Sequence, residues 1–195
     1  LDRADMALAE NQQQLLDAVA AVNPNVVVLL SAGAPVETPW VGRCKALVYG
    51  ALGGQAGAGA AADILTGKLC PCGKLSQTWA KAHDDTPAKA NFGGEGRNVE
   101  YREGLYVGYR YYQTAGVKPA FPFGYGLSYT TFEYSGLKAD ETGVTLTVTN
   151  TGRAAGAEIV QLYVAKPDAK IFRPEQELKG FAKVSLAPGE SKTVA

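Results

Sequence analysis

The chain has 195 residues, a formal charge of zero from 19 basic and 19 acidic side chains, and an ordinary hydrophobic content of 46%. This length suits one large domain or two small ones. Without a basic patch, nucleic acids and anionic membranes are poor candidates as partners. No apolar run approaches the roughly 20 residues that are needed to span a bilayer.

Three cysteines, Cys44, Cys70 and Cys72, are an odd number, which argues against a disulfide framework and favours a reducing, cytoplasmic compartment. Cys70 and Cys72 are too close for a relaxed disulfide, and a zinc site would need a second pair of ligands. We therefore expect no metal or other cofactor. The first residues do not resemble a signal peptide, and targeting by upstream sequence stays open.

The first predicted element is an amphipathic helix. Asn11 followed by Gln14 resembles a capping box, and apolar residues recur at helical spacing up to Val22. Asn23-Pro24 is expected to end this helix, because a residue before proline is biased away from helical backbone angles.

Two short apolar runs predict buried strands at residues 26–30 and 46–49. Residues 55–66 form an alanine-rich predicted helix that Gly67 is suited to end. Alternating strands and helices indicate a parallel sheet with right-handed crossovers. A covered parallel sheet of two or three strands is too small for a complete domain, so the sequence predicts half of one.

The middle of the chain reads as a loop followed by an aromatic region. Residues 84–98 are polar, rich in glycine and without periodicity, so we expect an exposed loop. Residues 101–131 contain most of the ten tyrosines, with glycines between them. This composition suits close packing of one body on another and predicts a seam between two domains.

The remaining residues predict short strands. Apolar and polar residues alternate over 144–148 and again over 160–164, as in half-buried strands. Pro188-Gly189 is expected to form a hairpin turn of type II character. This spacing favours a β-sandwich of fibronectin type III kind. Only about four strands fit here, whereas a closed sandwich has about seven, so we expect a truncated domain.

Six stretches of the sequence together resemble one known family. YREGLYVGYRYY (residues 101–112) and FPFGYGLSYTTF (121–132) resemble the junction between the α/β sandwich and the fibronectin type III-like domain of glycoside hydrolase family 3. Four further stretches agree in order: DRADMAL (2–8), NPNVVVLLSAGAPVETPW (23–40), GGQAGAGAAADILTGK (53–68) and ELKGF…VSLAPGES (177–191). The resemblance covers nearly the whole chain and is closest to the β-glucosidase branch.

The expected fold class is therefore α/β, with a mostly parallel sheet, followed by an all-β fibronectin type III-like sandwich. We expect the second half of the family 3 α/β sandwich at residues 1–100, an aromatic seam at 101–133 and an incomplete fibronectin type III-like domain at 134–195. The seam residues are Tyr101, Glu103, Arg110, Tyr111, Phe121, Phe123, Tyr125 and Tyr129.

The resemblance also says where the chemistry lies. Retaining glycosidases use two carboxyl groups, and in this family the nucleophile is an aspartate of a (β/α)8 barrel that the chain does not contain. The acid/base glutamate lies just ahead of an E-G-x-D-R motif, whose last two residues match Asp2-Arg3. We therefore expect neither catalytic carboxylate in this chain. Asp2 and Arg3 are expected either to support the acid/base loop by hydrogen bonds or simply to cap the chain locally.

Other residues could reach a sugar site from its edge. Glu37 follows a predicted strand at the sheet edge where ligands bind in α/β folds, and Trp40 could stack on a sugar ring or belong to the core. We assign both to the pocket rim. Glu103 is expected to form a structural ion pair with a neighbouring arginine, and His83 to lie on the surface. The glycines within residues 57–62 suit close helix packing better than a dinucleotide site.

The sequence therefore predicts a part of a retaining β-glucosidase that hydrolyses terminal non-reducing β-D-glucosyl residues. The expected partners are β-glucosides or short oligosaccharides and a missing barrel domain. This part is expected to be scaffold and outer pocket wall, without turnover of its own. A β-xylosidase of the same family is the alternative. A non-catalytic carbohydrate- or protein-binding module is another, which exposure of four tyrosines (106, 109, 111 and 112) would favour.

Overall fold

The computed structural model describes residues 5–94 and 96–195 and divides the chain into two compact units. The first unit comprises the chain up to Ala61 together with Gln77–Phe123, and the second comprises Ala62–Ser76 together with Gly124–Ala195. The aromatic seam thus contributes residues to both units. Within the described ranges, no helix is both long and apolar enough to cross a membrane.

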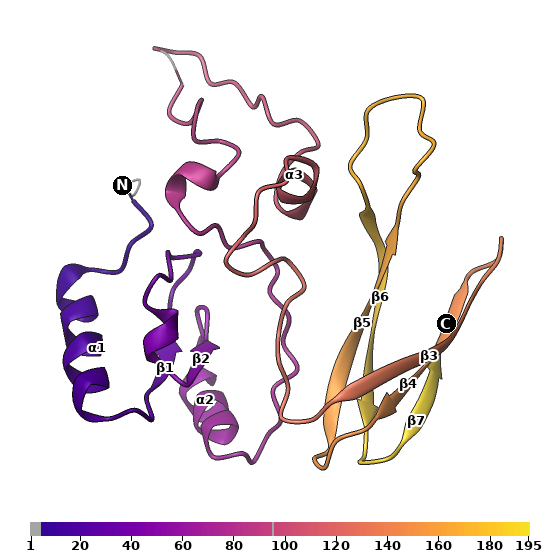
Figure 1. Cartoon of the computed structure of the whole chain (residues 1–195), viewed down its shortest axis with the longest axis horizontal. Helices are drawn as coiled ribbons and strands as arrows, with labels where there is room; N and C mark the ends of the chain where they lie inside the picture. Colours follow the sequence, from indigo (N-terminus) through magenta and orange to yellow (C-terminus); the bar gives the residue numbers. More distant parts are fainter. Residues whose placement is uncertain (1–4, 95) are drawn as a thin grey trace. The chain divides into compact units, whose positions relative to one another are not determined.

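The first unit contains a small parallel sheet, as predicted. Strand β1 (Val27–Leu30) pairs in parallel with β2 (Ala46–Tyr49), from Val27 opposite Ala46 to Leu30 opposite Tyr49 (Figure 1). Burial on both faces was expected, yet Val27 and Leu29 are about half exposed while Leu30 is buried. One face of β1 is therefore not fully covered by the described residues, because β-strand side chains alternate between the two faces.

Helix α1 (Glu10–Val22) precedes this sheet, but its predicted capping box is wrong. The helix begins at Glu10, so Asn11 lies inside the first turn, and Ala9 takes the N-cap position without a side-chain bond. The Gln14 side chain instead donates to the Glu10 carboxylate. The predicted end is confirmed, since the helix stops at Val22.

Two tryptophans form the centre of the first unit. Trp40 and Trp79 are each about 1% exposed, and Tyr49 of β2 meets Trp79 edge to face, with ring centroids 4.9 Å apart. A backbone bridge joins Trp79 to Phe121, the Trp79 amide donating to the Phe121 carbonyl at 2.8 Å. Such aromatic contacts add directional packing to the burial of large apolar surfaces. They attach residues 77–123 to the sheet region of this unit.

The remaining helices are short. They are 3-10 helix η1 (Val41–Arg43), α2 (Gly57–Leu65), 3-10 helix η2 (His83–Asp85) and α3 (Tyr109–Thr114). Gly67 ends the alanine-rich helix region as predicted. Its φ is +76°, and its amide donates to the Ile64 carbonyl. Glycine adopts this left-handed conformation without steric cost, which explains the residue type.

The second unit is a β-sandwich of five strands. One sheet has the order β3-β4-β7 and the other pairs β5 with β6 in a long antiparallel ribbon (Figure 1). The strands are β3 (Phe132–Ala139), β4 (Val144–Asn150), β5 (Gly156–Val164), β6 (Glu177–Leu186) and β7 (Ser191–Val194). Their inward side chains form one apolar core around Val148, Val160, Val184 and Leu186. This confirms the all-β prediction, with one strand more than expected.

The turn at Pro188-Gly189 is not a hairpin between paired strands. Gly189 has a φ of +76°, as a type II turn requires, but β7 pairs with β4 and not with β6. The chain therefore changes sheets here. Backbone hydrogen bonds hold the turn to β4: the Asn150 carbonyl accepts the Gly189 amide at 2.9 Å, and the Asn150 amide donates to the Glu190 carbonyl at 3.0 Å.

Asn150 is fully buried and its side chain makes four hydrogen bonds. Its amide nitrogen donates to the carbonyls of Ala154 (2.9 Å) and Leu186 (3.1 Å). Its amide oxygen accepts from the Thr130 hydroxyl (2.6 Å) and the Gly152 amide (3.0 Å). A buried amide is stable only when its donors and acceptors are satisfied, and here they are. Asn150 thus joins the two sheets and the chain that enters them.

Replacing Asn150 with alanine should destabilise the second unit by about 2–4 kcal/mol, because several buried backbone groups lose their partners. Urea unfolding of the chain measures this loss. Thr149→Ala is the matched control, since Thr149 lies beside it on β4 and makes only an exposed hydrogen bond to Ser191. The control should cost less than about 1 kcal/mol. Equal losses in the two variants would contradict the role given to Asn150.

Candidate functional site

A pocket of about 400 Å³ lies in the first unit. Three separate stretches of chain line it: the segment before α1, the loop after β1 and the region from η2 onward. Its lining residues are Asp5, Met6, Ala34, Pro35, His83, Thr86, Ala88, Lys89 and Phe92. The wall is mostly apolar, with one carboxylate, one imidazole and one ammonium group, a composition that suits binding of a small organic group.

The parallel sheet places this pocket at its carboxyl edge. Because β1 and β2 are parallel, the loops that follow them leave the same edge of the sheet. Hydrogen bonds hold these loops together: the Ser31 hydroxyl donates to the Ala51 carbonyl, and the Tyr49 hydroxyl to the Ala32 carbonyl. The loop after β1 then continues to the pocket residues. This is the edge at which α/β sheets bind their ligands.

Glu37, a predicted pocket-rim residue, lies on the same loop and joins the three stretches. Its carboxylate accepts the backbone amide of His83 at 2.7 Å, and its own amide donates to the Met6 carbonyl at 2.8 Å. Its carbonyl accepts the indole N–H of Trp40 at 3.2 Å. Glu37 does not itself line the pocket, but Met6 and His83, to which it bonds, both do.

The turn that begins at Ala82 is closed by its own hydrogen bonds. The Asp85 carboxylate accepts the Ala82 amide, and the Thr86 hydroxyl donates to the His83 carbonyl at 2.8 Å. Beside this turn, the Lys89 ammonium lies 2.8 Å from the Asp84 carboxylate. The hydrogen bond and charge of Lys89 lower the pKa of Asp84 below its usual value. Asp84 is therefore a surface carboxylate that stays ionised, as expected for a residue of this loop.

Trp40 is buried and offers no surface for stacking on a sugar. Only about 1% of its surface is exposed, so other atoms of the chain cover both ring faces. Its neighbours Val36 and Thr38 are also buried. Asp2 and Arg3, the predicted supports of the acid/base loop, lie outside the described residues, as does Glu95.

The predicted seam residues fall into several local contacts. In the first unit, Tyr109 stacks on Phe123 at 5.1 Å and Tyr111 meets Tyr112 edge to face at 5.2 Å. The Arg110 guanidinium lies 5.9 Å from the centre of the Tyr109 ring, at cation–π distance. These contacts order the short helix α3 and the chain after it.

The other seam residues contribute backbone or single contacts. Tyr101 is 87% exposed. Within the second unit, the Tyr125 carbonyl accepts the Leu75 amide, and the Tyr129 hydroxyl donates to the Ile64 carbonyl. Arg102 pairs with Glu100 at 2.6 Å, and the covered Oε2 atom of Glu103 has no hydrogen-bond partner among the described residues.

The described residues contain no cluster of three or more His, Cys, Asp or Glu side chains that could hold a metal ion. All three cysteines are free thiols, and burial raises the pKa of Cys44. Asp5 is the only carboxylate in the described pocket wall. Double-displacement glycoside hydrolysis needs two carboxyl groups about 5 Å apart, so the described wall lacks the pair for this chemistry.

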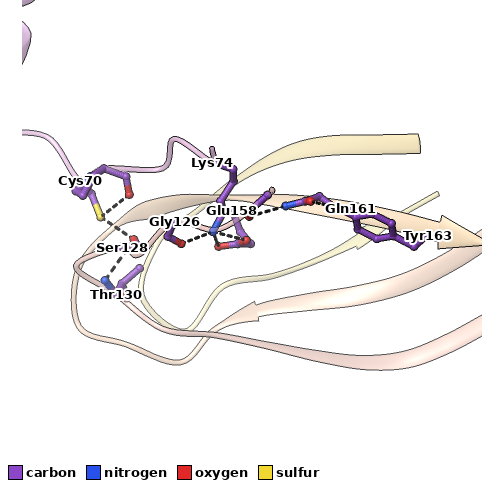
Figure 2. A network of polar contacts seen from close by, with 10 residues as sticks. Cys70, Lys74, Gly126, Ser128, Thr130, Glu158, Gln161 and Tyr163 are labelled. Carbon is purple, nitrogen blue, oxygen red and sulfur yellow. Dashed lines mark hydrogen bonds and ion pairs between the residues drawn. The ribbon is translucent and has the colours of Figure 1, made fainter. Parts of the chain in front are cut away.

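A second polar cluster lies in the second unit and was missed by the sequence reasoning. Figure 2 shows Lys74 reaching Glu158 of β5; the two charged groups are 3.0 Å apart and their side chains 14% and 12% exposed. The Lys74 ammonium also donates to the Gly126 carbonyl at 2.8 Å. Nearby, the Gln161 amide donates to the Gly124 carbonyl and accepts from the Tyr163 hydroxyl. Eighty-four residues separate Lys74 from Glu158, so no local pattern predicted the pair.

This cluster has a structural explanation. Its backbone partners belong to the stretch that leads into the sandwich, and the Cys70 thiol lies 3.1 Å from the Ser128 hydroxyl in the same region (Figure 2). A nearly buried charge is costly unless it is paired and hydrogen-bonded, as both partners are here. The cluster therefore attaches residues 70–76 and 124–130 to the β5–β6 sheet.

Comparisons with known proteins agree with this fold. Residues 1–129 match the model of the glycosyl hydrolase family 3 C-terminal domain, and residues 158–195 match that of the fibronectin type III-like domain. The fold and the sequence thus place the chain in the class of glycoside hydrolases. The chain belongs to glycoside hydrolase family 3, as the sequence resemblance predicted.

Individual relatives give the same result. Thermostable beta-glucosidase B of Acetivibrio thermocellus is 51% identical over 99% of this chain and 27% of its own length. The crystal structure of a beta-glucosidase of this family from Bifidobacterium adolescentis superposes with a TM-score of 0.96 at 46% identity, covering all of this chain and 30% of that one. An exo-alpha-(1->6)-L-arabinopyranosidase of Bifidobacterium longum is also 46% identical, over 100% of this chain and 26% of its own length. The chain thus spans about a quarter of the length of the curated relatives that it matches.

Glu158 of the second polar cluster also affects the titration of Tyr134 on β3. Partial burial, followed by the charge and hydrogen bond of Glu158, raises the pKa of Tyr134 to about 12. Since the folded chain then holds this proton more tightly than the unfolded chain, the resulting stability is complete below about pH 10 and is lost as the pH rises through about 12. Near-ultraviolet phenolate absorbance, with Tyr134→Phe identifying the signal, measures it. Ionisation of this tyrosine near its ordinary pKa of about 10 would contradict the assignment.

Proposed function

We propose that this chain is part of a longer retaining β-glucosidase, which hydrolyses terminal non-reducing β-D-glucosyl residues. The observation that carries the proposal is the 51% identity to a thermostable beta-glucosidase over 99% of the chain. The TM-score of 0.96 to a second beta-glucosidase of the family supports it. A barrel domain is expected in the sequence beyond this chain, because each relative is three to four times as long as the part that matches.

In this proposal the longer enzyme works by double displacement. An aspartate of the barrel attacks the anomeric carbon and forms a covalent glycosyl-enzyme, while a glutamate just ahead of Asp2-Arg3 protonates the departing oxygen. The same glutamate, now a carboxylate, then takes a proton from water as that water hydrolyses the ester. Neither step requires a metal or an organic cofactor.

The share of the present chain is support and pocket wall. The described pocket wall contains Asp5 as its single carboxylate, which fits a wall better than a reaction centre. The pocket lies next to the segment that begins at Asp5, two residues after Arg3. We therefore place this pocket on the outer side of the substrate site, where the part of the substrate beyond the first sugar would lie. Trp40, being buried, acts here by holding Glu37 and not by stacking on a sugar.

In this proposal, the first sugar is selected by the part of the enzyme that lies beyond this chain. This chain is 46% identical to a protein named for an L-arabinopyranoside substrate and 51% identical to one named a beta-glucosidase. Similar identity to proteins named for different sugars argues that this region does not select the first sugar. Because arabinopyranose is a pentose, this relative also keeps a pentosidase, such as the β-xylosidase considered above, as the alternative activity.

A non-catalytic binding module is less well supported. Exposure of four tyrosines in the aromatic seam would have favoured that alternative, but Tyr112 is buried and Tyr106, Tyr109 and Tyr111 are half-buried. Rings that the chain itself partly covers offer less surface for carbohydrate stacking.

The test is hydrolysis of an aryl β-glucoside by the 195-residue chain and by the longer protein. We expect turnover only in the longer protein, because the chain lacks the two carboxyl groups of the reaction. Aryl β-xyloside and aryl α-L-arabinopyranoside, assayed in parallel, separate the glucosidase from the alternatives. Turnover by the short chain would contradict the assignment of this region to scaffold and wall.

A further inference from the structure

We infer that Glu37 is a positioning residue for the catalytic acid/base, acting through the segment that begins at Asp5. This inference rests on the proposed function, because it assumes that the acid/base glutamate lies just upstream of Asp2-Arg3. What it adds is a specific residue, within this chain, whose backbone amide holds Met6 at the exit of the acid/base loop and whose carboxylate attaches the same loop to η2. Glu37 itself touches neither substrate nor reacting atoms in this assignment.

Glu37 is held rigidly by its neighbours. It lies between Val36 and Thr38, which are 3% and 5% exposed. Its carbonyl is held by the indole of Trp40, which is a core residue. A side chain whose backbone is fixed on both sides loses little further entropy when it makes a hydrogen bond. Glu37 is therefore a firm point of attachment for whatever bonds to it.

Glu37 joins two other segments of the chain. Its amide holds the Met6 carbonyl, and its carboxylate holds the amide of His83, at the start of η2. Hydrogen bonds that involve a charged carboxylate are shorter and stronger than neutral ones, and this one is 2.7 Å long. Asp5 further shapes the segment, since its carboxylate accepts the Ala7 amide at 3.0 Å. The segment after Arg3 is thus fixed to the loop after β1 through Met6, and that loop is fixed to η2 through the Glu37 carboxylate.

Proton donation depends on the position of the acid/base group. In the first step the acid gives its proton to the glycosidic oxygen while the C–O bond breaks, so the aglycone leaves as a neutral alcohol and the acid becomes a carboxylate. Proton transfer requires hydrogen-bond distance, and a displacement of about 1 Å can cost about a hundredfold in rate. Loss of the Glu37 carboxylate keeps the amide bond to Met6 but frees the loop after β1 from η2. Loosening the loop in this way impairs proton donation more than it impairs attack by the nucleophile.

The experiment compares leaving groups in the longer enzyme. An alkyl β-glucoside needs the proton, whereas dinitrophenolate leaves without it. For Glu37→Ala we expect kcat/KM to fall about tenfold to a hundredfold with the alkyl glucoside and to stay within about threefold of wild type with dinitrophenyl β-glucoside. The constant kcat/KM is used because it reports only the steps up to release of the aglycone. Glu37→Gln should restore activity, since its amide oxygen can still accept the His83 amide.

Two further variants complete the test. Glu37→Asp withdraws the carboxylate by one methylene and should show the same leaving-group dependence, which provides the measurement if the alanine variant does not fold. Glu100→Ala is the control, because Glu100 is an exposed carboxylate of the same unit that pairs with Arg102. It should leave both substrates unaffected.

The outcomes separate the two proposals. Equal loss with both substrates, or no loss with either, would overturn the positioning role and leave Glu37 a structural residue. Wild-type enzyme that hydrolyses neither glucoside would instead overturn the proposed function. Circular dichroism and thermal unfolding of each variant show whether a loss of activity follows a loss of folded protein.

Discussion

Glu37 joins three segments that are far apart in the sequence. Its carboxylate holds the backbone at His83, and its backbone amide holds Met6. The pocket wall is built from these segments, so its shape depends on both bonds of Glu37. The parallel pair β1 and β2 supplies the edge from which the loops leave, and buried Trp40 fixes the loop that carries Glu37.

The second unit uses the same principle with different groups. Buried Asn150 joins the two sheets, while the pair of Lys74 and Glu158 attaches the entering chain. All three cysteines are free, so the described chain contains no disulfide between them that could serve this purpose. Buried polar groups add little net stability, but an alternative arrangement would leave them unsatisfied, and they thereby specify one structure.

Local patterns predicted the elements whose causes are local. The apolar run of β1 and the glycine that ends the α2 region, Gly67, both appear as expected. The start of α1 was missed, because Ala9 takes the cap position despite the better capping residue Asn11. The turn at Pro188-Gly189 had the predicted conformation but not the predicted pairing, because β7 pairs with β4, where the backbone carbonyl of Asn150 also accepts the Gly189 amide. Glu37 was a candidate from its position after β1, yet its partners could only be found in three dimensions.

In the proposed longer enzyme, the reacting carboxylates lie outside this chain. A fluorinated β-glucoside that forms a long-lived glycosyl-enzyme labels the nucleophile covalently, and peptide mapping by mass spectrometry locates the label. The account predicts a labelled aspartate in a peptide that is absent from these 195 residues. A label on Asp5, Glu37, Glu103 or any other carboxylate of this chain would contradict it.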